Sequence, residues 1–140
     1  MHALAPILFA TLAAVTPVAH AADPKPQFDM TVDCSHWDRL NNYEMKQCSG
    51  RANVAADKEL DAAYRQLMAK MDDDDRKLLV AAERAWITWR DRECDYETQG
   101  VSGYEKSGTG YGLEWGQCRV RLTKARIVQL RGYLADMPGR

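Results

Sequence analysis

The sequence predicts an all-α fold, with three helices in an antiparallel arrangement, two disulfides, and a glycine-rich loop between the second and third helices. No proline occurs between Leu40 and Pro138, and Gly50 is the one glycine before Gly100. Such a long stretch with so few helix breakers favours helix. Apolar residues recur at steps of three and four rather than in the alternation typical of strands. The length of 140 residues suits a single domain of neighbouring helices.

The first 21 residues are predicted to be a secretory signal peptide. They contain no Lys, Arg, Asp or Glu, and their apolar run ends in Ala19-His20-Ala21, the small-residue pattern of a cleavage site. The run is shorter than a membrane span and is interrupted by Pro17. We therefore expect a secreted or periplasmic protein. Its predicted parts are a signal peptide over 1–21, an extended leader over 22–33, a helical domain over 34–134 and a tail over 135–140.

The first helical segment follows a possible helix start at Ser35–Asp38 and ends at a tract of four aspartates. Adjacent carboxylates repel each other, and aspartate is a poor residue inside a helix but a good N-cap. The tract Asp72–Asp75 is therefore predicted to be a turn that also begins the second helix. The apolar stripe of the first helix consists of Met45, Cys48, Ala52, Ala56, Leu60, Tyr64, Leu67 and Met71.

The second helix is predicted over 75–97, and its apolar face is wide. Two tryptophans, Trp86 and Trp89, lie one turn apart on this face, and we expect both to pack in the core because indole rings bury a large area. The stripe consists of Leu79, Ala82, Trp86, Trp89, Glu93 and Tyr96.

Residues 100–116 contain six of the nine glycines and no periodic pattern, so they are predicted to form a long loop. The third helix follows over 115–134. From Cys118 onward there are six basic residues and one acid, whereas the end of the second helix is rich in carboxylates. We expect these opposite charges to pair between the two helices. The apolar stripe of the third helix consists of Val120, Thr123, Ile127, Leu130 and Leu134.

Four cysteines follow the signal peptide, and export to an oxidising compartment predicts two disulfides. An antiparallel arrangement places Cys94, at the end of the second helix, near Cys118, at the start of the third. Pairing them leaves Cys34 with Cys48, which is the pairing that we favour. Cys48–Cys94 is the alternative, because Cys48 lies at a similar height on the first helix. The cysteines lack the close spacing of a zinc site, so we expect no metal and no cofactor.

The charge balance argues against several classes of function. With 19 basic and 20 acidic residues the net charge is −1, so nothing indicates binding to nucleic acid or to an anionic membrane. Catalysis is not expected either. His36 is the one histidine after residue 21, and it lacks a recognisable partner for nucleophilic chemistry. Solvation and ion pairing explain four carboxylates of the second helix better than a glycosidase pair does. They are Glu83, Asp91, Glu93 and Asp95.

Two segments are candidates for contact with a protein partner. One is the acidic tract, Asp72, Asp73, Asp74 and Asp75, which the helix cap explains as an alternative. The other is the aromatic, glycine-rich loop, which a simple connector explains as an alternative. Tyrosine and tryptophan on such loops supply contact area at a low cost in side-chain entropy. Its aromatic residues are Tyr104, Tyr111 and Trp115.

A longer motif runs through all three helical segments. Its most specific part is Arg84-Ala85-Trp86, followed by Arg90-Asp91 and Cys94. The rest consists of Cys34, Glu44, Met45, Cys48, Asp57, Leu60, Asp61, Tyr64, Leu79, Cys118, Leu122, Thr123, Arg126 and Leu130. Over about residues 33–134 the chain resembles the N-terminal domain of the LprI-type lysozyme inhibitors.

This resemblance implies a secreted or periplasmic binding protein that inhibits lysozyme. The alternative is an interaction module of the cell envelope with another protein partner. We interpret the motif residues Arg84, Trp86, Arg90 and Asp91 as structural, with Arg84, Arg90 and Asp91 in an ion network between helices; a binding surface is the alternative. Two positions depart from the family pattern, because Glu83 and Asp61 carry carboxylates where the family usually has amides. Hydrogen bonds at these two positions are expected to differ.

Overall fold

The computed structural model describes residues 27–137, so the predicted signal peptide and residues 22–26 of the predicted leader lie outside the described residues. Three long helices dominate this part of the chain, and it contains no strand, which confirms the all-α class. A short 3-10 helix, η1, precedes them, and a π-helix, η2, follows the second. The elements are η1 (Trp37–Arg39), α1 (Asn42–Met68), α2 (Asp73–Tyr96), η2 (Glu97–Val101) and α3 (Tyr111–Asp136).

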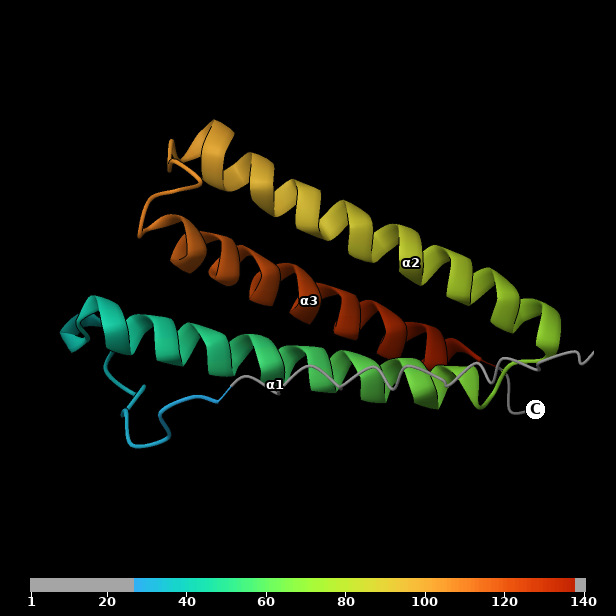
Figure 1. The fold of residues 1–140 in the computed structure, drawn as a ribbon. Coiled ribbons are helices and arrows are strands. Elements are labelled where there is room, and N and C mark those ends of the chain that lie inside the picture. Colours follow the sequence, from blue (N-terminus) through green and yellow to red (C-terminus); the bar gives the residue numbers. More distant parts are fainter. Residues whose placement is uncertain (1–26, 138–140) are drawn as a thin grey trace, which may run out of the picture.

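Helix α3 is the central helix of the bundle. Figure 1 shows the three helices side by side, with α2 running back past α3 toward the end where α1 begins. Helix α3 packs against α1 along its length and also against α2, whereas α1 and α2 have few direct contacts with each other. The turn between α1 and α2 and the loop between α2 and α3 therefore lie at opposite ends of the bundle (Figure 1).

Local capping determines where α1 and α2 begin. Asn41 caps α1, because its side chain accepts hydrogen bonds from the backbone N–H groups of Tyr43 and Glu44, and the Glu44 carboxylate accepts one from Asn41 N–H in return. The possible helix start at Ser35–Asp38 is thus only η1. Asp72 caps α2 by accepting from the N–H groups of Asp74 and Asp75, as the helix-cap interpretation predicts.

The buried apolar cluster lies at the end of the bundle near the turn between α1 and α2. Partly buried side chains, Trp86 among them, pack around this cluster. The stripes predicted for α1 and α3 supply most of its members, so the 3.6-residue periodicity located these faces correctly. The cluster consists of Leu60, Ala63, Leu67, Leu79, Ile127 and Leu130.

The face predicted for α2 is wrong in part. Trp89 is 48% exposed instead of packing in the core, and Ala82 and Tyr96 are exposed as well. Apart from Leu79, the buried residues of α2 are Glu83, Arg90 and Cys94, which lie on an adjacent face. The reason is that α2 packs mainly on one neighbour, α3, so part of its wide apolar face has nothing to pack against.

The loop between α2 and α3 is shorter than predicted. Helix α2 continues into η2, and α3 already begins at Tyr111, so residues 102–110 connect them. Gly116, where the predicted loop and the predicted third helix overlap, is buried within α3. A Cβ atom at this position would lie 2.6 Å from Ser49 Oγ on α1. The glycine is therefore needed for the close approach of α1 and α3, not for a turn.

Both favoured disulfides are confirmed, and the alternative pairing of Cys48 with Cys94 is wrong. Cys34–Cys48 ties the segment before η1 to α1, and Cys94–Cys118 ties the end of α2 to the start of α3. No free cysteine remains in the chain. The second disulfide closes the loop at its base, where the buried apolar cluster does not reach.

Trp86→Ala is expected to lower the free energy of unfolding by about 3 kcal/mol, because the indole packs against the buried cluster. Trp89→Ala is expected to change it by less than about 1 kcal/mol, because that indole is exposed. Urea denaturation of both variants measures the difference. A midpoint for Trp89→Ala as low as that of Trp86→Ala would show that Trp89 belongs to the core.

Candidate functional site

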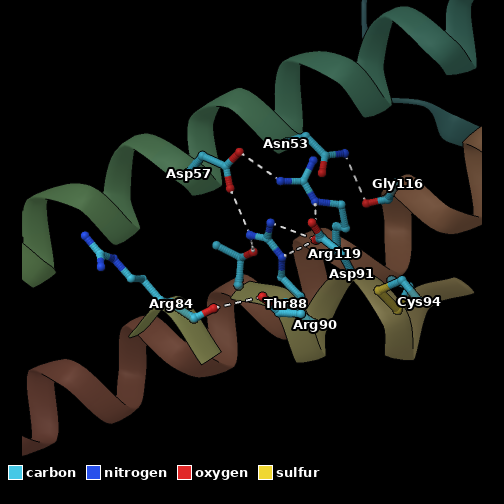
Figure 2. A network of polar contacts seen from close by, with 11 residues as sticks. Asn53, Asp57, Arg84, Thr88, Arg90, Asp91, Cys94, Gly116 and Arg119 are labelled. Atoms are coloured by element: carbon cyan, nitrogen blue, oxygen red, sulfur yellow. Dashed lines mark hydrogen bonds and ion pairs between the residues drawn. A yellow bond between two sulfur atoms is a disulfide. The ribbon is translucent and has the colours of Figure 1, made fainter. Parts of the chain in front are cut away.

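A network of polar contacts joins the three helices at the level of Arg90 (Figure 2). The Arg90 side chain is only 5% exposed. Its Nη1 lies 3.3 Å from Asp57 Oδ1 on α1 and 3.2 Å from Thr123 Oγ1 on α3. Its Nε and Nη2 lie 2.9 and 2.8 Å from Asp91 Oδ1 on α2 itself. One guanidinium group thus contacts side chains of all three helices.

Arg119 completes this network from α3. Its Nη2 lies 3.2 Å from Asp57 Oδ2, and its Nε lies 3.4 Å from Asp91 Oδ1. Two arginines therefore share two carboxylates, which balances the charges within the network. The carboxylates are nearly half exposed, while the guanidinium groups lie beneath them. Close by, the Asn53 side chain donates to the carbonyl oxygen of Gly116, which ties α1 to α3 again (Figure 2).

A second ion pair is buried about two turns closer to the apolar cluster. Arg126 Nε and Nη2 donate to Glu83 Oε2 at 3.0 and 2.8 Å, and both side chains are at most about a tenth exposed. The Trp86 ring lies near both buried arginines, with its centroid 5.3 Å from the guanidinium carbon of Arg90 and 5.7 Å from that of Arg126. This geometry allows cation–π attraction on top of burial.

Three of the four motif residues, Trp86, Arg90 and Asp91, take part in these contacts. Sequence reasoning missed that Asp57 and Thr123 are partners of Arg90. Both residues belong to the longer motif, and that was the available signal, although Thr123 was also counted in an apolar stripe. The pairing expected between the second and third helices is confirmed by three ion pairs, two from α2 and one from η2. They are Glu83–Arg126, Asp91–Arg119 and Glu97–Arg121.

The fourth motif residue, Arg84, lies outside the network. Within residues 27–137 no ion pair joins its guanidinium group, which Figure 2 shows reaching toward α1. It lines a groove of about 400 Å³ between α1 and α2. The other residues that line the groove are Leu60, Asp61, Tyr64, Val80, Glu83 and Ile87. The two carboxylates at positions that depart from the family pattern, Asp61 and Glu83, both reach this groove and are both paired with arginines.

Comparison with known proteins agrees with the motif. The model of the lysozyme inhibitor LprI family matches residues 35–130. The chain belongs to this family. It is also 29% identical over 145 residues to the uncharacterized protein R02472 of Rhizobium meliloti (strain 1021), and the match covers 94% of both chains. No solved structure matches the chain.

The two segments predicted to bind a partner lie at opposite ends of this LprI-family fold (Figure 1). Asp73 and Asp74 are exposed and pair with Arg76 and Lys77 on the next turn of α2. Nothing in the fold brings this turn toward the aromatic loop. The two segments therefore cannot form one continuous surface, and each has to be considered by itself.

The three aromatic candidates near the loop differ in their surroundings. The Tyr104 ring is 40% exposed and lies over Gly110. The Tyr111 hydroxyl donates a hydrogen bond to Asp95. Burial raises the pKa of Tyr111 to about 12, and the hydrogen bond to Asp95 acts in the same direction. Trp115 is half-buried, and its ring centroid lies 5.0 Å from the guanidinium carbon of Arg119.

Other classes of site have no support in the part of the chain that the structure describes. No three His, Cys, Asp or Glu side chains gather there in a way that could hold a metal ion. None of the described helices is long and apolar enough to cross a membrane.

Glu83→Leu is expected to lower the free energy of unfolding by about 3–5 kcal/mol, because Arg126 then stays buried without its carboxylate. The double variant Glu83→Leu/Arg126→Leu removes both charges and is expected to recover most of this loss. As a control, Asp61→Asn breaks the exposed pair with Arg65 and should cost less than about 1 kcal/mol. Urea denaturation gives all three values, and equal losses for the single and double variants would contradict the buried pair.

The raised pKa of Tyr111 predicts a pH dependence of stability. A tyrosine whose pKa rises from 10.0 to about 12 on folding favours the folded state while its phenol is neutral. This contribution is fully present below about pH 10 and is lost as the pH rises through about 12. Tyr111→Phe should therefore lose less stability than the wild type across this window, as measured by urea denaturation at stepped pH. Tyr43→Phe, at an exposed tyrosine of α1, is the control, and identical pH profiles for wild type and Tyr111→Phe would refute the prediction.

Proposed function

We propose that this protein is a secreted or periplasmic lysozyme inhibitor that acts by binding and not by catalysis. The observation that carries the proposal is the family match over residues 35–130, which includes all three helices except the last turn and a half of α3. The way in which the helices are held together also supports the proposal. A domain held by two disulfides and two buried ion pair networks is a rigid scaffold, and rigidity lowers the cost of binding.

Export is supported by the sequence and by the cysteines. The predicted signal peptide ends at Ala21, and all four cysteines of the remaining chain are paired. Structural disulfides of this kind persist in the periplasm and outside the cell. A lysozyme that attacks the cell wall would be met in the same compartments.

Charge supports a basic partner. Residues 22–117 contain 13 basic and 19 acidic residues, a net charge of −6, whereas the remaining part of α3 is basic. Animal-type lysozymes are basic proteins, so the acidic part of the chain would attract them at long range. In this proposal the antiparallel arrangement presents the acidic turn Asp72–Asp75 at one end and the glycine-rich loop at the other.

Within the loop, Tyr104 is better placed to contact a partner than the other two aromatic candidates. Tyr111 and Trp115 are engaged with Asp95 and Arg119, so they support the base of the loop. Tyr104 is more exposed and follows Gly103, whose φ of 71° allows the sharp bend there. We propose that the loop contributes contact area and that the acidic turn contributes attraction at a distance.

The protein is expected to bind hen egg-white lysozyme and to slow its lysis of bacterial cell walls. Binding measured by surface plasmon resonance should weaken when salt is raised toward about 0.15 M, where the Debye length falls to about 8 Å. Asp73→Asn/Asp74→Asn should slow association more than it speeds dissociation, because exposed charges that only steer act on the rate of encounter.

The matched control is Glu59→Gln/Asp61→Asn on α1. It also removes two carboxylates from exposed ion pairs, so the net charge is the same in both variants. A larger fall in the association rate for Asp73→Asn/Asp74→Asn than for the control would locate the steering at the acidic turn. Equal falls would show that only the net charge of the protein matters. No detectable binding at micromolar protein to any animal-type lysozyme would overturn the proposal and leave the envelope interaction module.

A further inference from the structure

Helix α2 carries a row of exposed apolar side chains along one face. Leu78, Trp89 and Tyr96 are 70%, 48% and 63% exposed. Steps of 11 and 7 residues return to the same side of an α-helix, so these three side chains share a face. Ala82 and Ala85, which lie on this face between Leu78 and Trp89, are exposed as well. The row runs for about 27 Å along the helix, given a rise of 1.5 Å per residue.

Nothing in the described part of the chain covers this row. Helix α2 contacts the rest of the bundle through a different face, on which Leu79, Glu83, Arg90 and Cys94 are buried. Single exposed apolar residues are ordinary on a protein surface, but a row that includes two large aromatic rings indicates an interaction surface.

The aromatic end of the row is held in place by the backbone. Tyr96 is the last residue of α2, directly before the π-helix η2, and the ring lies so close to Gly100 that a Cβ atom there would approach it to 3.0 Å. Short π-helical segments are frequent at functional sites. A ring that is already ordered loses little entropy on binding, and such aromatic residues often dominate the energy of protein interfaces.

Charges beside the row favour a basic partner over a second copy of this chain. The first turn of α2 carries Asp73, Asp74 and Asp75, and the last turn has no basic residue. Glu93 lies beside Tyr96 at the other end of the row, and the one base next to it is Arg92. Helix α2 contains seven acidic and five basic residues, so two copies docked through this face would bring two helices of the same net charge together, which is unfavourable. A cationic surface fits a helix with this net charge.

We propose that the face of α2 formed by Leu78, Trp89 and Tyr96 is the main contact surface for the basic lysozyme, with Trp89 and Tyr96 as its anchors and the loop as an additional contact. This inference rests on the proposed function and names the contact surface for it. This surface is distinct from the loop and from the acidic turn, because its apolar anchors lie in the middle and at the end of α2.

The test compares alanine variants for binding to hen egg-white lysozyme by surface plasmon resonance and for inhibition of cell-wall lysis. Trp89→Ala and Tyr96→Ala should each weaken binding by about 30-fold or more, mainly through faster dissociation. Val128→Ala on α3 and Tyr43→Ala on α1 are matched controls, because both side chains are exposed apolar or aromatic groups away from this face. Circular dichroism should show wild-type helix content and thermal midpoints for all four variants.

The possible outcomes separate the inference from the proposed function. Wild-type binding that survives both Trp89→Ala and Tyr96→Ala overturns the inference and leaves the inhibitor proposal intact. Absence of wild-type binding overturns both. A dimer that sedimentation detects in the wild type and that Trp89→Ala abolishes would assign this face to a second copy, which also overturns the inference.

Discussion

The contacts of the Arg90 guanidinium group with all three helices are the interaction on which the rest of this structure depends. Asp57, Asp91 and Thr123 satisfy its donors, and Arg119 balances the second carboxylate. A buried charge costs several kcal/mol unless it is paired and hydrogen-bonded, so only the register that brings these groups together is favourable. The network therefore selects how the three helices align, which a small apolar core could not do by itself.

Three kinds of interaction stabilise different parts of the bundle along its length. The apolar cluster holds the end near the turn between α1 and α2, the ion networks hold the middle, and the disulfide Cys94–Cys118 holds the end near the loop. A domain of this size buries only a modest core, and disulfides compensate by restricting the unfolded chain. Because α3 lies between its neighbours and supplies most of the packing, the outer face of α2 is left exposed by the rest of residues 27–137.

Much of the candidate site was predictable as a type of interaction, but not as a set of contacts. The motif indicated an ion network at Arg90 and Asp91, and the opposite charges of the second and third helices indicated pairing between them. Their partners could not be assigned, because a helical stripe gives the direction of a side chain but not the helix that it meets. Glu83 illustrates this, since only the packing of α3 against α2 shows that it is buried with Arg126.

The sequence by itself determined the helical class, the acidic turn as a cap, the stripes of the first and third helices, and the family. These properties depend on local periodicity, on helix breakers and caps, and on a motif of fixed order, all of which can be read along one chain. Only the tertiary structure decided that Cys48 pairs with Cys34, that Gly116 lies against α1, and that Trp89 is exposed while Trp86 packs on the core. The physical reason is that burial depends on which neighbours a helix has, and α2 has fewer than its wide apolar face would require.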